Sequence, residues 1–158
     1  MEKLSLSLMT KKLCHKYFQE FTNDSDICLN DSEFREFVYK KEVVDKYYEH
    51  QQQDNRKAFF IMKNNDPIGE VILKKIDYIK KECTLSIHLQ NDTVKGQGIG
   101  TWAEKQIIDY AFNELNLGTV FADTVKKNVR SQNVLKKVGF EIINEDELFK
   151  YYFIKKKS

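Results

Sequence analysis

In the first third of the chain, the spacing of hydrophobic residues changes from the two-residue period of a strand to that of a helix. Leu4, Leu6 and Leu8 alternate with polar residues, as in a half-buried strand. Thr10 then suits the N-cap of a helix, because the apolar residues after it recur at helical spacing. A longer amphipathic pattern runs from Asp31 to about Gln53 and predicts a second helix. The chain is therefore expected to begin with one strand and two helices.

Three strands are predicted next. The segments "AFFIMK" at 58–63 and "IGEVILKKI" at 68–76 flank "NNDP", which favours a tight reversal and hence a hairpin. The third strand is "CTLSIHLQ" at 83–90. Its alternation places Leu85, Ile87 and Leu89 on the core face and His88 on the opposite, polar face.

The second half of the chain alternates helices with strands. Apolar residues at four-residue intervals from Ala103 to Leu115 predict a helix that stops near Gly118, and "TVFADTV" follows as a strand. Asn128 suits the N-cap of a further helix that Gly139 would end. Two closing strands, "FEIIN" and "LFKYYFIKK", complete the order β-α-α-β-β-β-α-β-α-β-β. Residues 1–158 are expected to form a single α/β domain with a mixed sheet.

Composition narrows the class of protein. Apolar residues make up 41% of the chain and aromatic residues 13%, which is typical of a globular domain. The net charge of +2 gives no support to a nucleic-acid partner. Three cysteines without a CxxC pair predict neither a disulfide framework nor a metal site. The N-terminus lacks a signal-peptide pattern and no apolar run reaches the ~18 residues of a membrane span, so we expect a cytoplasmic protein without membrane contact.

Gly96, Gly98 and Gly100 lie between the third strand and the next helix. Backbone amides at a helix start have no helical acceptor, and glycines let an anion approach them. A nucleotide P-loop is excluded because Thr101 and Trp102, rather than Lys and Ser or Thr, follow the last glycine. The spacing also differs from that of a dinucleotide fingerprint. A plain glycine-rich turn without a ligand remains an open alternative.

The stretch "VKGQGIGTWAEKQIIDYAF", followed by Asn128, Ser131 and the pair Gly139 and Phe140, resembles the acetyl-CoA-binding core of the GNAT family. GNAT proteins are Gcn5-related N-acetyltransferases, and the resemblance is to the branch of ribosomal-protein N-terminal and spermidine acetyltransferases. It is strongest from Ser86 to Phe140, while the element order matches over nearly the full chain. Lys95 stands where the family usually has Arg or Gln.

The resemblance implies a mixed, mostly antiparallel sheet with a central splayed pair of strands, and a site for acetyl-CoA. Leu89 and Gln90 would offer backbone groups to the pantetheine arm, and Asn128 and Ser131 would contact it from the other side. Asn128 could equally be a plain helix cap. The pyrophosphate would be bound by amides of the loop and helix start: Lys95, Gly96, Gln97, Gly98, Ile99, Gly100 and Thr101.

The catalytic residues are less clearly marked. The backbone N–H of Leu89 would stabilise the oxyanion, and His88 is the candidate proton acceptor, although a lone histidine on a polar strand face is also a common surface residue. The family often has a tyrosine where this chain has Leu135, and a glutamate near Thr84. The secondary candidates for the acceptor pocket are Glu70, Asp123 and Tyr152.

The resulting hypothesis is an acetyl-CoA-dependent N-acetyltransferase in which a primary amine attacks directly within a ternary complex. The acceptor would be a small molecule or a protein N-terminus, and the family also suggests a homodimer. A second hypothesis is a coenzyme A-binding or regulatory module without catalysis, because the tyrosine and the glutamate are missing. A nucleic-acid partner is the weakest alternative.

Overall fold

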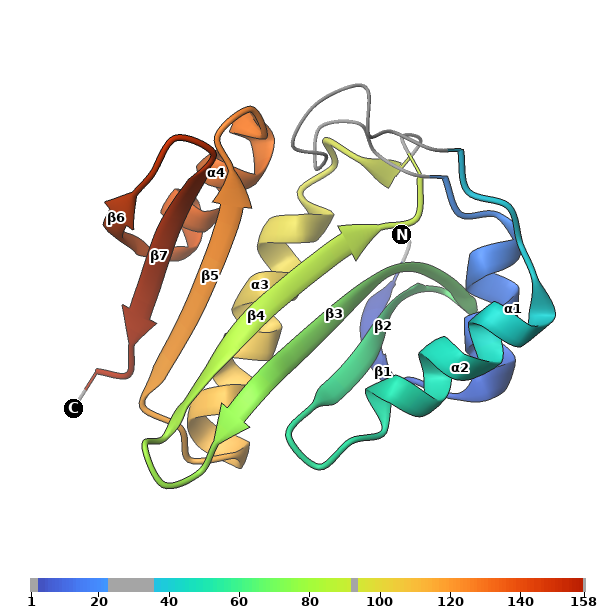
Figure 1. Ribbon diagram of the computed structural model, residues 1–158, viewed down its shortest axis with the longest axis horizontal. Coiled ribbons are helices and arrows are strands. Elements are labelled where there is room, and N and C mark those ends of the chain that lie inside the picture. Colours follow the sequence, from blue (N-terminus) through green and yellow to red (C-terminus); the bar gives the residue numbers. More distant parts are fainter. Residues whose placement is uncertain (1–2, 23–35, 92–93, 158) are drawn as a thin grey trace.

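The computed structural model describes residues 3–22, 36–91 and 94–157. Their strands form one seven-stranded sheet in the order β1-β2-β3-β4-β5-β7-β6 (Figure 1). All neighbouring strands are antiparallel except β4 and β5, which are parallel. The strands are β1 (Leu4–Leu8), β2 (Lys57–Lys63), β3 (Asp66–Asp77), β4 (Glu82–Leu89), β5 (Thr119–Val125), β6 (Glu141–Glu145) and β7 (Phe149–Lys155). The predicted mixed, mostly antiparallel sheet is confirmed.

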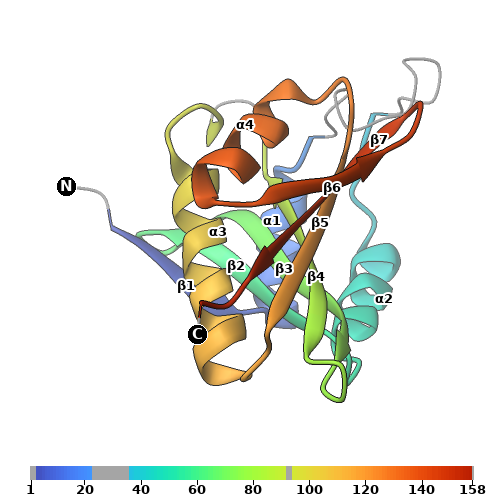
Figure 2. The ribbon, with the colours of Figure 1, turned by 90° about the vertical axis from the view of Figure 1, so that its left-hand side faces the viewer.

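Helices cover both faces of the sheet (Figure 2). One face carries α1 (Lys11–Gln19) and α2 (Lys41–Gln51), and the other carries α3 (Ile99–Asp109), its π-helical continuation η4 (Tyr110–Glu114) and α4 (Val129–Val138). The period of two in β2 explains the two layers. Ala58, Phe60 and Met62 pack with α1 and α2, whereas Phe59 and Ile61 pack in the cluster that contains α3.

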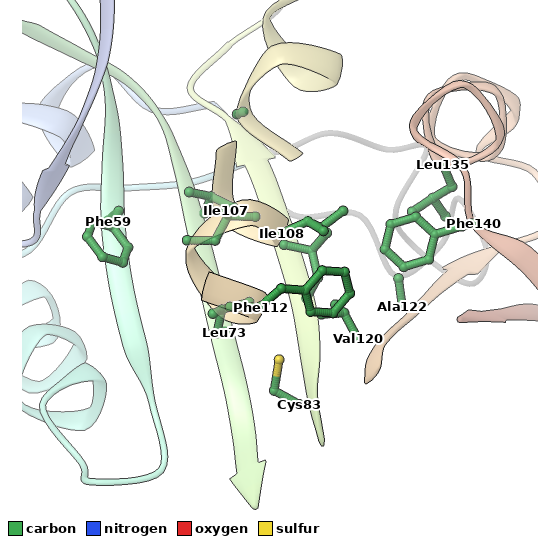
Figure 3. Packing of buried hydrophobic residues seen from close by; sticks show 14 of the residues in the cluster. Phe59, Leu73, Cys83, Ile107, Ile108, Phe112, Val120, Ala122, Leu135 and Phe140 are labelled. Atoms are coloured by element: carbon green, nitrogen blue, oxygen red, sulfur yellow. The ribbon is translucent and has the colours of Figure 1, made fainter. Parts of the chain in front are cut away.

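The larger hydrophobic cluster lies between the sheet and α3. Figure 3 shows Ile107 and Ile108 of α3, with Phe112 of η4, packed against strand residues that include Leu73 and Val120. Ile107 is fully buried, as the four-residue spacing predicts. The helix ends before the predicted Gly118, because a π turn closes at Leu115, whose N–H donates to Tyr110 O at 3.1 Å. This cluster fixes α3 against the strands that it crosses.

The second predicted helix begins later than its pattern suggested. Residues 31–35 lie outside the described part of the chain, and 36–40 are not helical. Lys40 is the N-cap of α2, with an extended backbone. Phe37 lies seven residues before Val44 and Tyr39 four before Val43, which is helical spacing, but both pack from a non-helical segment onto the cluster around α1. Their apolar character reflects that contact and not a longer helix.

The predicted caps are confirmed. The Thr10 hydroxyl accepts a hydrogen bond from Leu13 N at 3.2 Å at the start of α1. Asn128 Oδ1 accepts from Ser131 N at 3.1 Å at the start of α4. Gly139 ends α4 with a φ of 115°, a conformation that favours glycine.

Candidate active site

The parallel strands β4 and β5 separate along their length (Figure 1). Their pairing covers only Glu82–Thr84 against Thr119–Phe121. The remainder of β4, from Leu85 to Leu89, pairs with β3 alone among the described strands, through Gly69–Leu73. The central splayed pair that the resemblance implies is therefore present. Two adjoining cavities lie where the strands part, and we call them together the β4–β5 cleft.

Both faces of the sheet contribute to this cleft. Leu85, Glu104 and Leu135 come from the face of α3 and α4, whereas Ser86 and Lys74 belong to the alternate positions on the other face. The five residues that line both cavities are Ile87, His88, Glu104, Asn128 and Ser131. The cleft thus passes through the sheet and can bring two ligands together from opposite sides.

The glycine loop lies at one end of the cleft. Gly96 and Gly98 have φ angles of 75° and 77°, and a side chain at either position would point into open space. Gly98 is the N-cap of α3 and offers no capping side chain, so the N–H groups of Ile99, Gly100 and Thr101 have no helical acceptor. Such a helix start favours an anion.

Lys95 and Gly100 line the same cavity as Asn128 and Ser131. The loop, the start of α3 and the start of α4 therefore meet at one opening. Gln97 is exposed beside the two left-handed glycines. This grouping of amides and one lysine suits a phosphate-bearing ligand.

The backbone groups of Leu89 and Gln90 differ in their hydrogen bonding and in whether they point toward the cleft. Gln90 N donates to Ile68 O at 2.8 Å and Gln90 O accepts from Thr22 N at 3.0 Å, so both backbone groups of Gln90 already have partners within the protein. Its side chain also donates to Tyr17 O at 2.8 Å, which anchors the end of β4 to α1. Successive amides of a strand point to opposite edges, so the N–H of Leu89 points toward the cleft.

A second cavity lies on the face of α1 and α2. We call it the aromatic pocket, and its lining consists of Phe18, Phe21, Phe37, Val43, Val44, Tyr47, Glu70 and His88. Its polar groups are few and adjacent. Glu70 and His88 are direct cross-strand partners, and Tyr47 OH donates to Glu70 Oε2 at 2.8 Å. His88 also lines both cavities of the cleft, so it lies where the two sites meet.

Burial changes the acid strength of Glu70. The residue is 4% exposed, and burial raises the pKa of its carboxyl to about 7, while the hydrogen bond from Tyr47 acts in the opposite direction. The carboxyl can therefore exchange a proton near neutral pH. The His88 ring lies 3.4 Å from Ser86 Oγ, measured from Nε2. The side chain of His88 is half-buried under α1 and α2, not on an open surface.

The other secondary candidates are distributed differently. Asp123 is exposed and lines the outer part of the cleft. Tyr152 is 1% exposed and belongs to the hydrophobic cluster around α3. Thr84 pairs with Lys74 and Phe121 at the point where the splay begins. Tyr152 is thus a core residue.

Two features of the site were not predicted from the sequence, namely Glu104 and the aromatic pocket. Glu104 is 2% exposed on α3, and burial raises the pKa of its carboxyl to about 8. Its signal was present, because Glu104 lies one turn before Ile108 on the apolar stripe. The aromatic pocket gave no such signal, since its walls come from α1, α2, β3, β4 and the segment that contains Phe37.

Within the described residues, no cluster of three metal-ligating side chains occurs and no helix is long and apolar enough to cross a bilayer.

Comparisons with solved structures place this fold among acetyltransferases. The spermidine N-acetyltransferase from Vibrio cholerae in complex with CoA and spermine is 18% identical, with a TM-score of 0.78, over 96% of this chain and 95% of that one. The Campylobacter jejuni N-acetyltransferase PseH in complex with acetyl coenzyme A is 20% identical, with a TM-score of 0.73, over 98% of this chain and 100% of that one. Both likenesses concern the fold.

Sequence comparisons agree. The Escherichia coli (strain K12) spermidine N(1)-acetyltransferase is 27% identical over 113 residues, which are 72% of this chain and 59% of that protein. A protein named as a probable N-acetyltransferase from Bacillus subtilis (strain 168) is 30% identical over 64% of this chain and 57% of its own length. The chain thus spans less than two thirds of these relatives. The family model of the acetyltransferase (GNAT) domain matches residues 4–141, and the chain therefore belongs to the GNAT acetyltransferase family.

Proposed function

We propose that the protein is an acetyl-CoA-dependent N-acetyltransferase that acts on a small primary amine with an apolar substituent. One observation carries the proposal: the β4–β5 cleft passes through the sheet, and His88 lines both this cleft and the aromatic pocket on the far side. A donor and an acceptor bound from opposite faces would meet at β4. Proximity of this kind supplies much of the rate of a two-substrate reaction.

The residues of the cleft suit coenzyme A. The free N–H groups of Ile99, Gly100 and Thr101, with the charge of Lys95, would hold the pyrophosphate. Bound acetyl-CoA would supply an activated acetyl thioester. The N–H of Leu89 points into the cleft and is available to donate to a carbonyl oxygen that gains negative charge.

The aromatic pocket would hold the amine. The carboxylate form of Glu70 attracts an ammonium group, and the rings of Phe18, Phe21 and Tyr47 surround an apolar substituent. His88, beside Glu70, is placed to accept the proton that the amine must lose. One buried carboxyl suits a monoamine better than a polyamine, which carries several charges.

Acetylation assays with a panel of amines test this function. The panel contains phenethylamine, spermidine and a peptide with a free N-terminus, and product formation is followed by mass spectrometry. We expect phenethylamine to give the highest kcat/KM. Preference for spermidine or the peptide would contradict the proposed acceptor, and coenzyme A binding without any acetylation would favour the non-catalytic module.

The glycine loop allows a separate test of the donor site. Gly98→Glu places bulk and negative charge where the phosphate would lie, so we expect coenzyme A affinity to fall by about 100-fold or more, measured by calorimetry. Gly98→Ala is the matched control, because it imposes the same backbone strain at a φ of 77° without the charge. Equal losses in both variants would show that strain, and not the anion site, causes the effect.

The two confirmed helix caps make a second matched pair. Asn128→Ala and Thr10→Ala each remove a side-chain acceptor, so each should lower the free energy of unfolding by about 1 kcal/mol. Only Asn128 lines the β4–β5 cleft. We expect only Asn128→Ala to weaken coenzyme A binding as well. Denaturant unfolding of both variants measures the loss of stability, and calorimetry on the folded variants measures coenzyme A affinity. Unchanged affinity in Asn128→Ala would limit Asn128 to its capping role.

A further inference from the structure

Glu104 is a carboxylic acid buried among hydrophobic residues. It is 2% exposed, and its helical neighbours Ala103, Ile107 and Ile108 belong to the hydrophobic cluster. Among the residues that the structure describes, none hydrogen-bonds to its Oε1 atom. A buried carboxyl without a partner destabilises a fold, so a group of this kind in a cleft suggests a ligand that completes it.

The position of Glu104 specifies which part of a ligand it would meet. It lines both cavities of the cleft, one turn of α3 beyond Gly100, as do Ile87 of β4 and Ser131 of α4. The phosphate-binding amides lie at the start of the same helix. If the phosphates of a ligand bind at this helix start and the rest of the ligand extends into the sheet, Glu104 would contact the part beyond the phosphates and not the nucleotide.

We propose that Glu104 binds an amide group of the pantetheine arm of coenzyme A, through a neutral carboxyl whose O–H donates a hydrogen bond to the amide carbonyl. This inference rests on the proposed function. A protonated carboxyl has one O–H donor, which complements the C=O acceptor of a trans amide, whose N–H points to the opposite side. An ionised carboxylate would lose the donor and leave a buried charge.

The protonation state is consistent with this role. Burial raises the pKa of Glu104 to about 8, so the carboxyl is mostly protonated at pH 7. The charged and titratable side chains that line the same cavities are Lys74 of β3, His88 of β4, Lys95 of the loop, Asp123 of β5 and Arg130 of α4. Since these groups remain in any Glu104 variant, they cancel in a comparison between variants.

Calorimetric titration of coenzyme A into three proteins tests the proposal. Glu104→Gln keeps a neutral donor and acceptor, so its affinity should stay within about threefold of the wild type at pH 7. Glu104→Leu removes the hydrogen bond and should weaken binding about tenfold or more. Between pH 7 and pH 9 the wild-type affinity should fall more steeply than that of Glu104→Gln, which cannot ionise.

Adenosine 3′,5′-bisphosphate, which lacks the pantetheine arm, is the control ligand. Its affinity should be the same in all three proteins, and circular dichroism should confirm that each is folded. Equal coenzyme A affinities in wild type and Glu104→Leu would overturn the proposal while the proposed function stands. Failure of wild-type protein to bind coenzyme A at all would instead overturn the proposed function.

Discussion

His88→Ala is expected to lower the kcat of amine acetylation by about 100- to 10,000-fold at pH 7, the range typical of a lost proton acceptor. The reason is positional. His88 lines the β4–β5 cleft and the aromatic pocket, and it is the cross-strand partner of Glu70. Steady-state kinetics with saturating acetyl-CoA and a calorimetric coenzyme A titration would separate the chemical step from donor binding.

His50→Ala is the matched control, because His50 is an exposed histidine on α2 whose ring hydrogen-bonds to Gln53, one turn away. Its kcat should not change. Added imidazole should restore part of the activity of His88→Ala, whereas a merely structural role of His88 would give no rescue. A His88→Ala variant with the wild-type kcat would show that the amine proton leaves by another route, through Glu70 or water.

The second large effect concerns stability: the free energy of unfolding should decrease as the pH rises from about 5 to 8. The folded pKa of Glu104 is about 8, above the ordinary value of 4.5 that we take for the unfolded chain. Between these values the folded state keeps a proton that the unfolded chain releases, so rising pH favours unfolding. Glu70, with a folded pKa of about 7, acts in the same direction. Denaturant unfolding at several pH values measures this slope.

Glu104→Leu should reduce this slope and raise the free energy of unfolding at pH 7 by about 1–3 kcal/mol, because it removes a buried, unpartnered polar group. The decrease that remains, from Glu70, should end near pH 7. Glu104→Gln should show the same reduced slope with less gain in stability. A slope that is unchanged in both variants would show that Glu104 does not hold its proton in the folded state. Stability gained at the expense of coenzyme A affinity would mark Glu104 as a functional residue.

Local patterns predicted most of the fold. The strand at Leu4–Leu8, the spacing of Ile107 and the caps at Thr10 and Asn128 depend on near neighbours in sequence, and each is present in the structure, although Leu8 is 63% exposed and not buried as its alternation predicts. The predicted start of α2 was wrong because Phe37 makes a tertiary contact from a non-helical segment. In the sequence, an apolar residue with this role cannot be distinguished from one on a helical face.

The site was predictable only where it is continuous in sequence. The loop from Lys95 to Thr101 and the caps of α4 are short segments with backbone chemistry of their own. The aromatic pocket instead joins side chains from α1, α2, β3 and β4, whose proximity depends on strand register and helix packing. Gln90 shows the same limit, because its pairing with Ile68 and Thr22 depends on β3 and on the end of α1. Such contacts have no local pattern.

The parting of β4 and β5 has a further consequence for association. Unpaired strand edges at the rim of a sheet recruit strands from other chains and so promote aggregation. Here the pairing stops at Thr84 and Phe121, so two such edges face each other in the middle of the sheet. Helices α3 and α4 lie over one face there (Figure 2). The protein thus keeps its open backbone inside the sheet and not at its rim, where strands of other chains are most readily added.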